Sequence, residues 1–200
     1  MKSLLKSWIF WVIVVLGVLF AISYNGLVSK DEAANNAWGQ VENVYQRRAD
    51  LIPNLMETVK GYMAHERGTL EAVTQARQQV VNVMAEVKDK GINLAASPEM
   101  QKQFFQAQDG LNSALSRLMV VVEKYPDLKA NESVAKFMDE QAGTENRVAV
   151  ERKRFQDSVN AYNVSVRGFP SLIVAKICGF DKREYYKADE GASKAPKVKF

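Results

Sequence analysis

The stretch WGQVENVYQRRADLIPNLMETVKGY (residues 38–62) places apolar or aromatic residues at alternating steps of three and four. The positions in this series are Trp38, Val41, Tyr45, Arg48, Ile52, Leu55, Val59 and Tyr62. Residues three and four apart share one helix face, so the series predicts a helix that packs this face inside a bundle. Pro53 lies within the series and predicts a bend over residues 49–53 rather than an end. Asp31 is the expected N-cap.

Three further helices are predicted after this one. The second covers about residues 69–88 and is closed by Gly91, the third opens at Pro98, and the fourth is capped by Asn131. Their core-facing series are Val73, Ala76, Val80, Val83 and Val87; then Phe104, Gln108, Leu111, Leu115, Leu118 and Val122; then Val134, Phe137, Met138, Gln141, Glu145, Val148, Arg152, Phe155, Val159, Tyr162 and Val166. The short turns between the four helices predict an all-α fold, an antiparallel up-and-down four-helix bundle over residues 30–182.

A run without charged residues precedes this domain, WIFWVIVVLGVLFAISY at residues 8–24. As a helix, these residues span roughly 26 Å, close to the roughly 30 Å hydrocarbon core of a bilayer. We interpret the run as a transmembrane helix that follows a short basic N-terminus, residues 1–7. A cleaved signal peptide is the alternative, because residues 21–23 (Ala-Ile-Ser) form a small-x-small cleavage site. A core helix would show a polar face, which this run lacks.

Basic residues on the two sides of the run predict its orientation. Lys2 and Lys6 precede it, whereas Lys30 is the only basic residue among the dozen that follow. This distribution predicts an N-terminus inside the cell. The expected location is therefore a single pass through the inner (cell) membrane with an extracytoplasmic bundle, and a cytoplasmic bundle is the alternative.

The overall charge is too small for a nucleic-acid-binding protein. The chain has 27 Lys and Arg against 23 Asp and Glu, a net charge of +4, which falls to +2 without Lys2 and Lys6. Nucleic-acid binding requires a clustered basic surface, so no nucleic-acid partner is predicted. Cys178, the single cysteine, excludes an internal disulfide. It lies in an apolar strip, residues 171–180, expected to pack on the bundle or to lie on the bilayer surface. Residues 183–200 are expected to form a flexible polar tail.

Five polar residues occupy core-facing positions in the predicted helices: Arg48, Gln108, Gln141, Glu145 and Arg152. A buried charge costs several kcal/mol unless it is paired. Helices one and four are expected to be antiparallel neighbours, so we hypothesise an Arg48–Glu145 ion pair, with Gln108 or Gln141 satisfying the remaining groups. The alternatives are that these side chains lean out to solvent, or that they form a functional site inside the bundle.

The sequence offers no catalytic residues and no cofactor or metal site. His65 precedes Glu66, but an HExxH zinc motif needs a second histidine where Thr69 stands. His65 and Cys178 are a poor metal-binding set, and the chain lacks GxSxG, GxxxxGK[ST] and GxGxxG motifs. We therefore predict that the protein is not an enzyme.

One turn is a candidate partner contact. It comprises Tyr125, Pro126, Asp127 and Leu128, between the third and fourth helices. An ordinary connection between helices explains these residues equally well.

Several motifs resemble those of the LemA family of membrane-anchored bacterial proteins. They are YNGLV at 24–28, AWGQV at 37–41, QRRADLIPNL at 46–55, VKGY at 59–62, HE at 65–66, YPDLKA at 125–130, TENR at 144–147, YN at 162–163, FP at 169–170 and GF at 179–180. The chain departs from the family pattern at Phe155-Gln156, where the family often has Tyr-Asn, and near Gln141, where it often has Leu.

The resemblance implies an N-terminal membrane helix followed by a helical bundle, and it implies no enzymatic activity. It favours a cytoplasmic bundle, opposite to the orientation that the basic residues predict. A magnetosome-membrane relative of the family suggests a role in organising membrane. Our first hypothesis is a non-enzymatic membrane-anchored scaffold that contacts lipid through its N-terminal helix and binds copies of itself or an unknown protein partner. The alternatives are an accessory factor of a membrane enzyme or protease, and an extracytoplasmic peptide or lipid sensor.

Overall fold

The computed structural model describes residues 2–63 and 65–185, with side chains placed from Trp8 onward, and this part of the chain is mainly helical. The elements in chain order are α1 (Lys2–Lys60), α2 (Arg67–Asp89), the 3₁₀ turn η1 (Leu94–Ala96), α3 (Pro98–Val122), α4 (Pro126–Lys129), α5 (Glu132–Arg167) and α6 (Ser171–Cys178). No β-strand occurs among these residues. The all-helical prediction with an apolar N-terminal helix is therefore confirmed.

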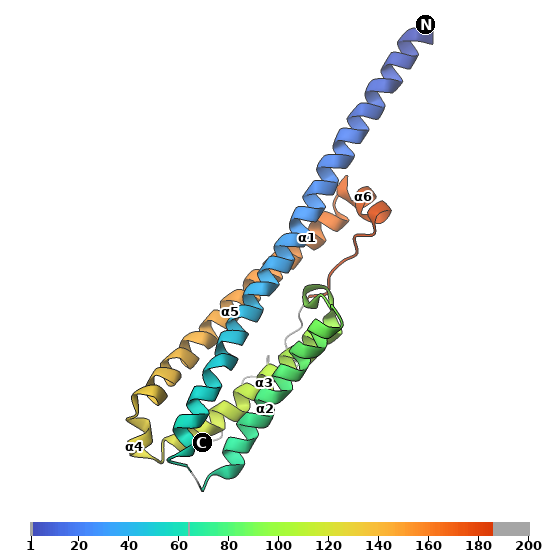
Figure 1. Cartoon of the computed structure of the whole chain (residues 1–200). Helices are drawn as coiled ribbons and strands as arrows, with labels where there is room; N and C mark the ends of the chain where they lie inside the picture. Colours follow the sequence, from blue (N-terminus) through green and yellow to red (C-terminus); the bar gives the residue numbers. More distant parts are fainter. Residues whose placement is uncertain (1, 64, 186–200) are drawn as a thin grey trace, which may run out of the picture.

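The first helix is much longer than predicted. α1 covers 59 residues, roughly 90 Å at 1.5 Å per residue, and its N-terminal part extends beyond the other helices (Figure 1). Asp31 lies inside α1, so its predicted role as an N-cap is wrong, and no gap separates the apolar run from residues 30–60. Residues 25–33 hold no proline and only one glycine, which lets the helix continue. Pro53 also lies inside α1 without ending it, as predicted.

The other helix boundaries agree closely with the prediction. The Asn131 side chain accepts a hydrogen bond from the backbone N–H of Ser133 at 3.0 Å and caps α5. Gly91 has a φ of 60°, a left-handed conformation that ends the α2 segment at little steric cost. Pro98 opens α3 at its first turn, although the Ser97 side chain makes no capping hydrogen bond.

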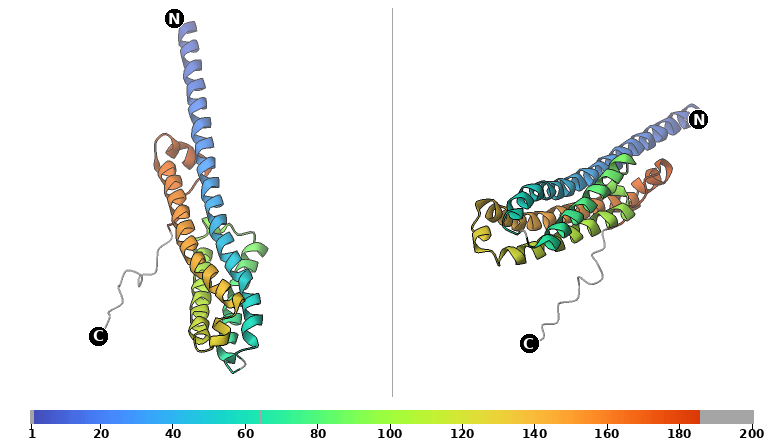
Figure 2. Two further views of the ribbon diagram at one scale, coloured as in Figure 1. Left: turned by 90° about the vertical axis from the view of Figure 1, so that its left-hand side faces the viewer. Right: turned by 60° about the horizontal axis from the view of Figure 1, so that its bottom comes forward.

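The helices associate as two close pairs. α1 packs along α5 and α2 packs along α3, and further views show the same neighbours (Figure 2). α6 lies against α1 and α5, near the point where α1 leaves the other helices. This arrangement buries the predicted face of α1 from Trp38 to Val59, whereas Tyr62, the last member of the series, is 47% exposed.

The buried side chains form three successive clusters along α1. The first, most distant from the N-terminus, contains Ile52, Leu55, Val59, Val73, Leu111, Leu115, Leu118, Leu128, Val134 and Phe137 among others. The second contains Trp38, Val41, Tyr45, Phe104, Phe105, Phe155 and Val159 among others. The third contains Leu27, Tyr162, Val166, Val174 and Ala175, with Phe180 packed against it.

Aromatic rings dominate the second cluster. The Trp38 ring meets Phe104, Phe105 and Phe155 edge to face, with centroid separations of 5.8, 5.6 and 5.0 Å. Edge-to-face contacts of this kind add stability beyond the apolar area that they bury. Because the three phenylalanines come from α3 and α5, Trp38 ties α1 to both helices.

We expect Trp38→Ala to lower the free energy of unfolding by about 3–5 kcal/mol, because it leaves a large cavity among these rings. Urea unfolding of the full chain in mild detergent, followed by far-ultraviolet circular dichroism, measures the change. Tyr62→Ala is the matched control, since it removes an aromatic ring from the exposed end of the same series. Equal losses in the two variants would contradict the assigned core.

Candidate functional site

A layer of polar residues separates the first and second clusters. Arg48 follows Tyr45 and precedes Ile52 on α1, and Gln108 and Asn112 occupy the corresponding level of α3. Arg48 is 4% exposed and Gln108 is 2% exposed, whereas Gln141 is half-buried and Glu145 is exposed. The structure therefore brings most of the predicted polar residues together and leaves Glu145 at the surface.

Arg48 is paired with an amide and not with the predicted carboxylate. Its Nη2 donates to Asn112 Oδ1 at 2.6 Å. Gln141 Nε2 donates to the same Asn112 oxygen at 3.4 Å, and it also donates to Glu145 Oε1 at 3.5 Å. No Arg48–Glu145 ion pair occurs among the described residues, so the hypothesised direct pair is not formed. Glu145 is solvated, which costs less than burying a second charge.

Arg152 enters the layer from α5 and stacks on aromatic rings. Its guanidinium carbon lies 4.3 Å from the centroid of Phe105 and 5.7 Å from that of Tyr45. This position places the guanidinium over the electron-rich faces of the two rings. Burial, opposed by the nearby Arg152 charge, raises the pKa of Tyr45 to about 12. Burial also lowers the pKa of Arg48, against the opposing charges of Tyr45, Glu145 and Asp109.

Some buried atoms of the layer have no hydrogen-bond partner within the described chain, among them Arg48 Nε, Gln108 Oε1 and Gln141 Oε1. Donors and acceptors are both present, a mixture suited to water rather than to a charged ligand. The layer is therefore best explained as a structural device that aligns α1, α3 and α5.

We expect substitutions at Arg48 and Asn112 to have coupled effects on the free energy of unfolding. Arg48→Met should cost about 1–3 kcal/mol of unfolding free energy, because Asn112 loses its best donor. Asn112→Leu should cost about 3–5 kcal/mol, because it leaves a buried guanidinium without its acceptor. The double variant should cost less than the sum of the two, as measured by urea unfolding. Glu145→Gln is the control and should change stability by less than about 0.5 kcal/mol; a larger loss would restore the Arg48–Glu145 hypothesis.

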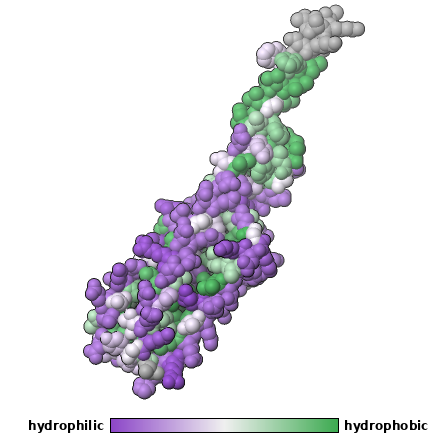
Figure 3. Space-filling model, in the orientation of Figure 1, coloured by the Kyte–Doolittle hydropathy of each residue, from purple (hydrophilic) through white to green (hydrophobic). Residues whose placement is uncertain are grey.

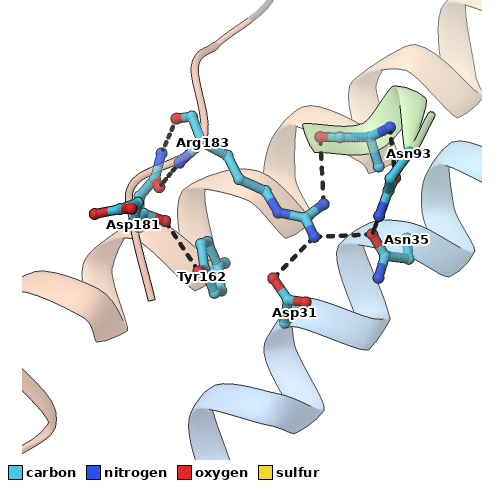
Figure 4. A network of polar contacts seen from close by, with 8 residues as sticks. Asp31, Asn35, Asn93, Tyr162, Asp181 and Arg183 are labelled. Carbon is cyan, nitrogen blue, oxygen red and sulfur yellow. Dashed lines mark hydrogen bonds and ion pairs between the residues drawn. The ribbon is translucent and has the colours of Figure 1, made fainter. Parts of the chain in front are cut away.

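A second polar network, centred on Arg183, lies beside the third cluster (Figure 4). Arg183 Nη2 contacts Asp31 Oδ1 and Asn35 Oδ1, both at 2.8 Å, and Nη1 donates to the backbone oxygen of Ala95 at 3.3 Å. The same guanidinium lies 5.3 Å from the centroid of the Tyr162 ring. One side chain therefore joins α1, η1 and α5.

The backbone around Arg183 is also fixed. Asn163 accepts from the Arg183 N–H at 2.9 Å and donates to the Arg183 carbonyl oxygen at 2.8 Å. The Tyr162 hydroxyl donates to the carbonyl oxygen of Asp181 at 2.9 Å. Burial raises the pKa of this hydroxyl, with Asp31 adding to the shift. The sequence predicts a flexible tail from residue 183, but Arg183 is buried, because Asp31 pairs with its guanidinium and Asn163 binds its backbone. The rest of the predicted tail, residues 186–200, lies outside the described part.

We expect Arg183→Met to lower the unfolding free energy by about 3–5 kcal/mol, because Asp31 and the Ala95 carbonyl lose a buried partner. Lys182→Met, at the exposed neighbouring position, is the matched control and should change stability by less than about 0.5 kcal/mol. Thermal unfolding in detergent distinguishes the two. Similar melting temperatures for both variants would mean that the network contributes little.

An open groove of about 660 Å³ runs between α1 and α2. Ala49, Val80 and Met84 lie among its apolar residues. The charged residues on the α1 side are Glu42 and Asp50, and those on the α2 side are Arg77 and Lys88. Arg77 Nε reaches the Ala49 carbonyl oxygen at 3.5 Å, so Arg77 lies level with Asp50. The groove thus has an acidic rim and a basic rim, a feature that the sequence pattern did not reveal.

The remaining candidates are weak sites. Leu128 is fully buried in the first cluster, so the Tyr125–Leu128 turn contains a core residue, and only Pro126 and Asp127 of that turn are exposed. His65 and Cys178 are both exposed. Within the described ranges, no group of at least three His, Cys, Asp or Glu residues could hold a metal ion.

Comparison with known proteins identifies relatives over most of the chain. The model of the LemA family matches residues 37–200. Magnetosome protein MamQ of Magnetospirillum gryphiswaldense is 28% identical over 174 residues, which cover 82% of this chain and 64% of the relative. Magnetosome protein MamQ 2 of Paramagnetospirillum magneticum is 27% identical over 192 residues, with coverage of 88% and 71%. Protein LemA of Metamycoplasma hominis is 22% identical over 171 residues, with coverage of 84% and 72%. The chain thus spans slightly under two thirds of the first relative.

Proposed function

The chain belongs to the LemA family, and from this membership and the geometry above we propose that it is a non-enzymatic, membrane-anchored scaffold of the bacterial inner membrane. The observation that carries the proposal is the continuity of α1. One helix supplies both an apolar stretch exposed along its length and the central face of the helical core. The protein would therefore hold its helical domain rigidly against a bilayer.

The N-terminal part of α1 has the properties that a spanning helix requires. Its most apolar 18-residue window has a mean hydropathy of 2.2, and only 11% of that window is buried inside the protein. A core helix of a soluble protein would be mostly covered. The exposed part carries Trp8, Phe10, Trp11 and Leu16, and its apolar surface is seen where α1 extends beyond the domain (Figure 3). We propose that residues 8–24 cross the membrane once as an uncleaved anchor after a basic N-terminus, residues 1–7.

We further propose that α1, α2, α3 and α5 act as an antiparallel up-and-down four-helix bundle within residues 30–182. The short connections between successive helices, residues 61–66, 90–97 and 123–131, support this topology. The shared clusters support it as well, because each of the first two contains residues from all four helices or from their immediate connections.

The sequence has none of the catalytic or phosphate-binding motifs named above, which supports a role without catalysis. The buried polar residues are used in contacts between helices, such as Arg48 to Asn112 and Arg183 to Asp31. The names of the relatives, magnetosome proteins and LemA, describe no enzymatic reaction. We therefore assign these buried groups to stability rather than to substrate turnover.

The groove between α1 and α2 supports self-assembly. In a dimer about a two-fold axis parallel to the helices, the acidic rim of one copy faces the basic rim of the other. Asp50 of one copy would then lie opposite Arg77 of the second, since the two residues are level within one chain. The same axis leaves both N-terminal helices pointing into one membrane. Anchoring in two dimensions raises the effective concentration, so weak contacts of this kind suffice.

Crosslinking on intact spheroplasts tests both the assembly and the orientation. A lysine-reactive reagent that cannot cross membranes should give discrete dimer or higher bands, because the bundle is proposed to lie on the extracytoplasmic side. Bands that require a permeant reagent would place the bundle in the cytoplasm. Monomer alone with both reagents would contradict self-assembly and would favour the alternatives, an accessory factor of a membrane enzyme or protease, or a peptide or lipid sensor.

Charge reversal locates the interface. Asp50→Lys should remove the crosslinked bands, because it places like charges opposite each other, and Arg77→Glu in the same chain should restore them. Asp139→Lys is the matched control, since Asp139 is an exposed carboxylate on α5 outside the groove. Loss of bands in the control as well would show that the charge change acts without specificity for the groove.

A further inference from the structure

The short helix α6 and the turn before it carry an apolar stripe that no described residue covers. Phe169, Ile173 and Ile177 are spaced four residues apart and are 84%, 52% and 69% exposed. Ile173 and Ile177 lie on one side of α6, and Phe169 lies in the turn just before this helix. The opposite side of α6 is buried, because Val174 and Ala175 pack in the third cluster with Leu27. α6 is therefore fixed to the domain by one face and presents an apolar face outward.

The position of α6 relates this stripe to the membrane. The Tyr24 and Phe180 rings meet at 5.8 Å, and Ser23 and Leu27 on α1 are both buried at this level. Tyr24 is the last residue of the apolar run, where tyrosine is favoured at the boundary between lipid and water. α6 thus lies beside α1 at the height at which the proposed span would leave the bilayer (Figure 1).

We propose that the Phe169–Ile173–Ile177 stripe inserts into the lipid interface beside the anchor, giving the protein a second contact with the bilayer. This inference rests on the proposed spanning role of residues 8–24. The apolar surface of the N-terminal helix continues toward α6, which favours lipid over a protein partner (Figure 3). Short amphipathic helices bury their apolar face at the boundary between headgroups and acyl chains in this way.

Two further features suit this location. Lys176 is exposed on α6, and a lysine can bury its aliphatic stem while its ammonium reaches the headgroups. The segment that follows α6 is held by the Arg183 network, with Nη2 of Arg183 at 2.8 Å from Asp31 of α1. The height of α6 along α1 is therefore fixed, and the stripe cannot drift away from the membrane surface without breaking that network.

Depth-dependent fluorescence quenching tests the proposal on the full chain in phosphatidylcholine vesicles. In a Cys178→Ser background, single cysteines are introduced as Ile177→Cys, Leu16→Cys and Val120→Cys and labelled with an environment-sensitive fluorophore. Val120 is the matched control, an apolar residue of α3 that is 66% exposed. We expect lipids with a nitroxide near the headgroup to quench the Ile177 probe, lipids with a nitroxide deep in the chains to quench the Leu16 probe, and neither to quench the Val120 probe.

The outcomes distinguish a failure of the α6 proposal from a failure of the proposed membrane anchor. If the Leu16 probe is quenched while the Ile177 probe behaves like the Val120 probe, the anchor stands and the α6 contact is refuted. If the Leu16 probe is also unquenched, the anchor fails and the α6 proposal fails with it. Energy transfer between Ile177 probes on different copies, without nitroxide quenching, would show that a second copy covers the stripe and would also overturn the proposal.

Discussion

The structure depends on one helix that must satisfy two different environments. The N-terminal part of α1 exposes apolar side chains along its length, whereas the part from Trp38 to Val59 exposes polar side chains and buries a single face. A helix can make this change without a break because its backbone hydrogen bonds are internal everywhere. The chain therefore requires no linker between the proposed span and the domain. Every other element is arranged around the C-terminal two thirds of this helix.

The core shows how polar groups can position helices that apolar contacts alone would allow to slide. Two apolar clusters are separated by the layer in which Arg48 binds Asn112. Sliding α1 along α3 would move the guanidinium into an apolar cluster, where an unpaired charge is costly. The third cluster has a corresponding constraint in Arg183, whose partners lie on three elements. Each level of the domain thus has either close apolar packing or a specific polar contact.

Periodicity predicted the helices and most of the core because both depend on local spacing. The series from Trp38 to Val59 is buried as expected, and so is the series from Phe104 to Val122 on α3. One helix boundary and one buried contact could not be read from the sequence in this way. Asp31 resembles an N-cap, but its carboxylate binds Arg183, 152 residues further along the chain, and the helix continues through it. Asn112, the partner of Arg48, also stood outside the predicted apolar series. Contacts between residues distant in sequence therefore account for most of the differences, and for the Arg183 network in particular.

If residues 8–24 span a membrane as proposed, the unbroken course of α1 would make the tilt of the domain depend on the bilayer. Residues 25–60 continue the helix for roughly 54 Å beyond Tyr24. Membrane helices commonly tilt by about 20° to match the thickness of their bilayer, and a rigid extension of this length would swing its far end sideways by roughly 18 Å for such a tilt. A thicker or thinner membrane would thus change the tilt of the whole domain. Lipid composition could in this way set which faces of neighbouring molecules meet.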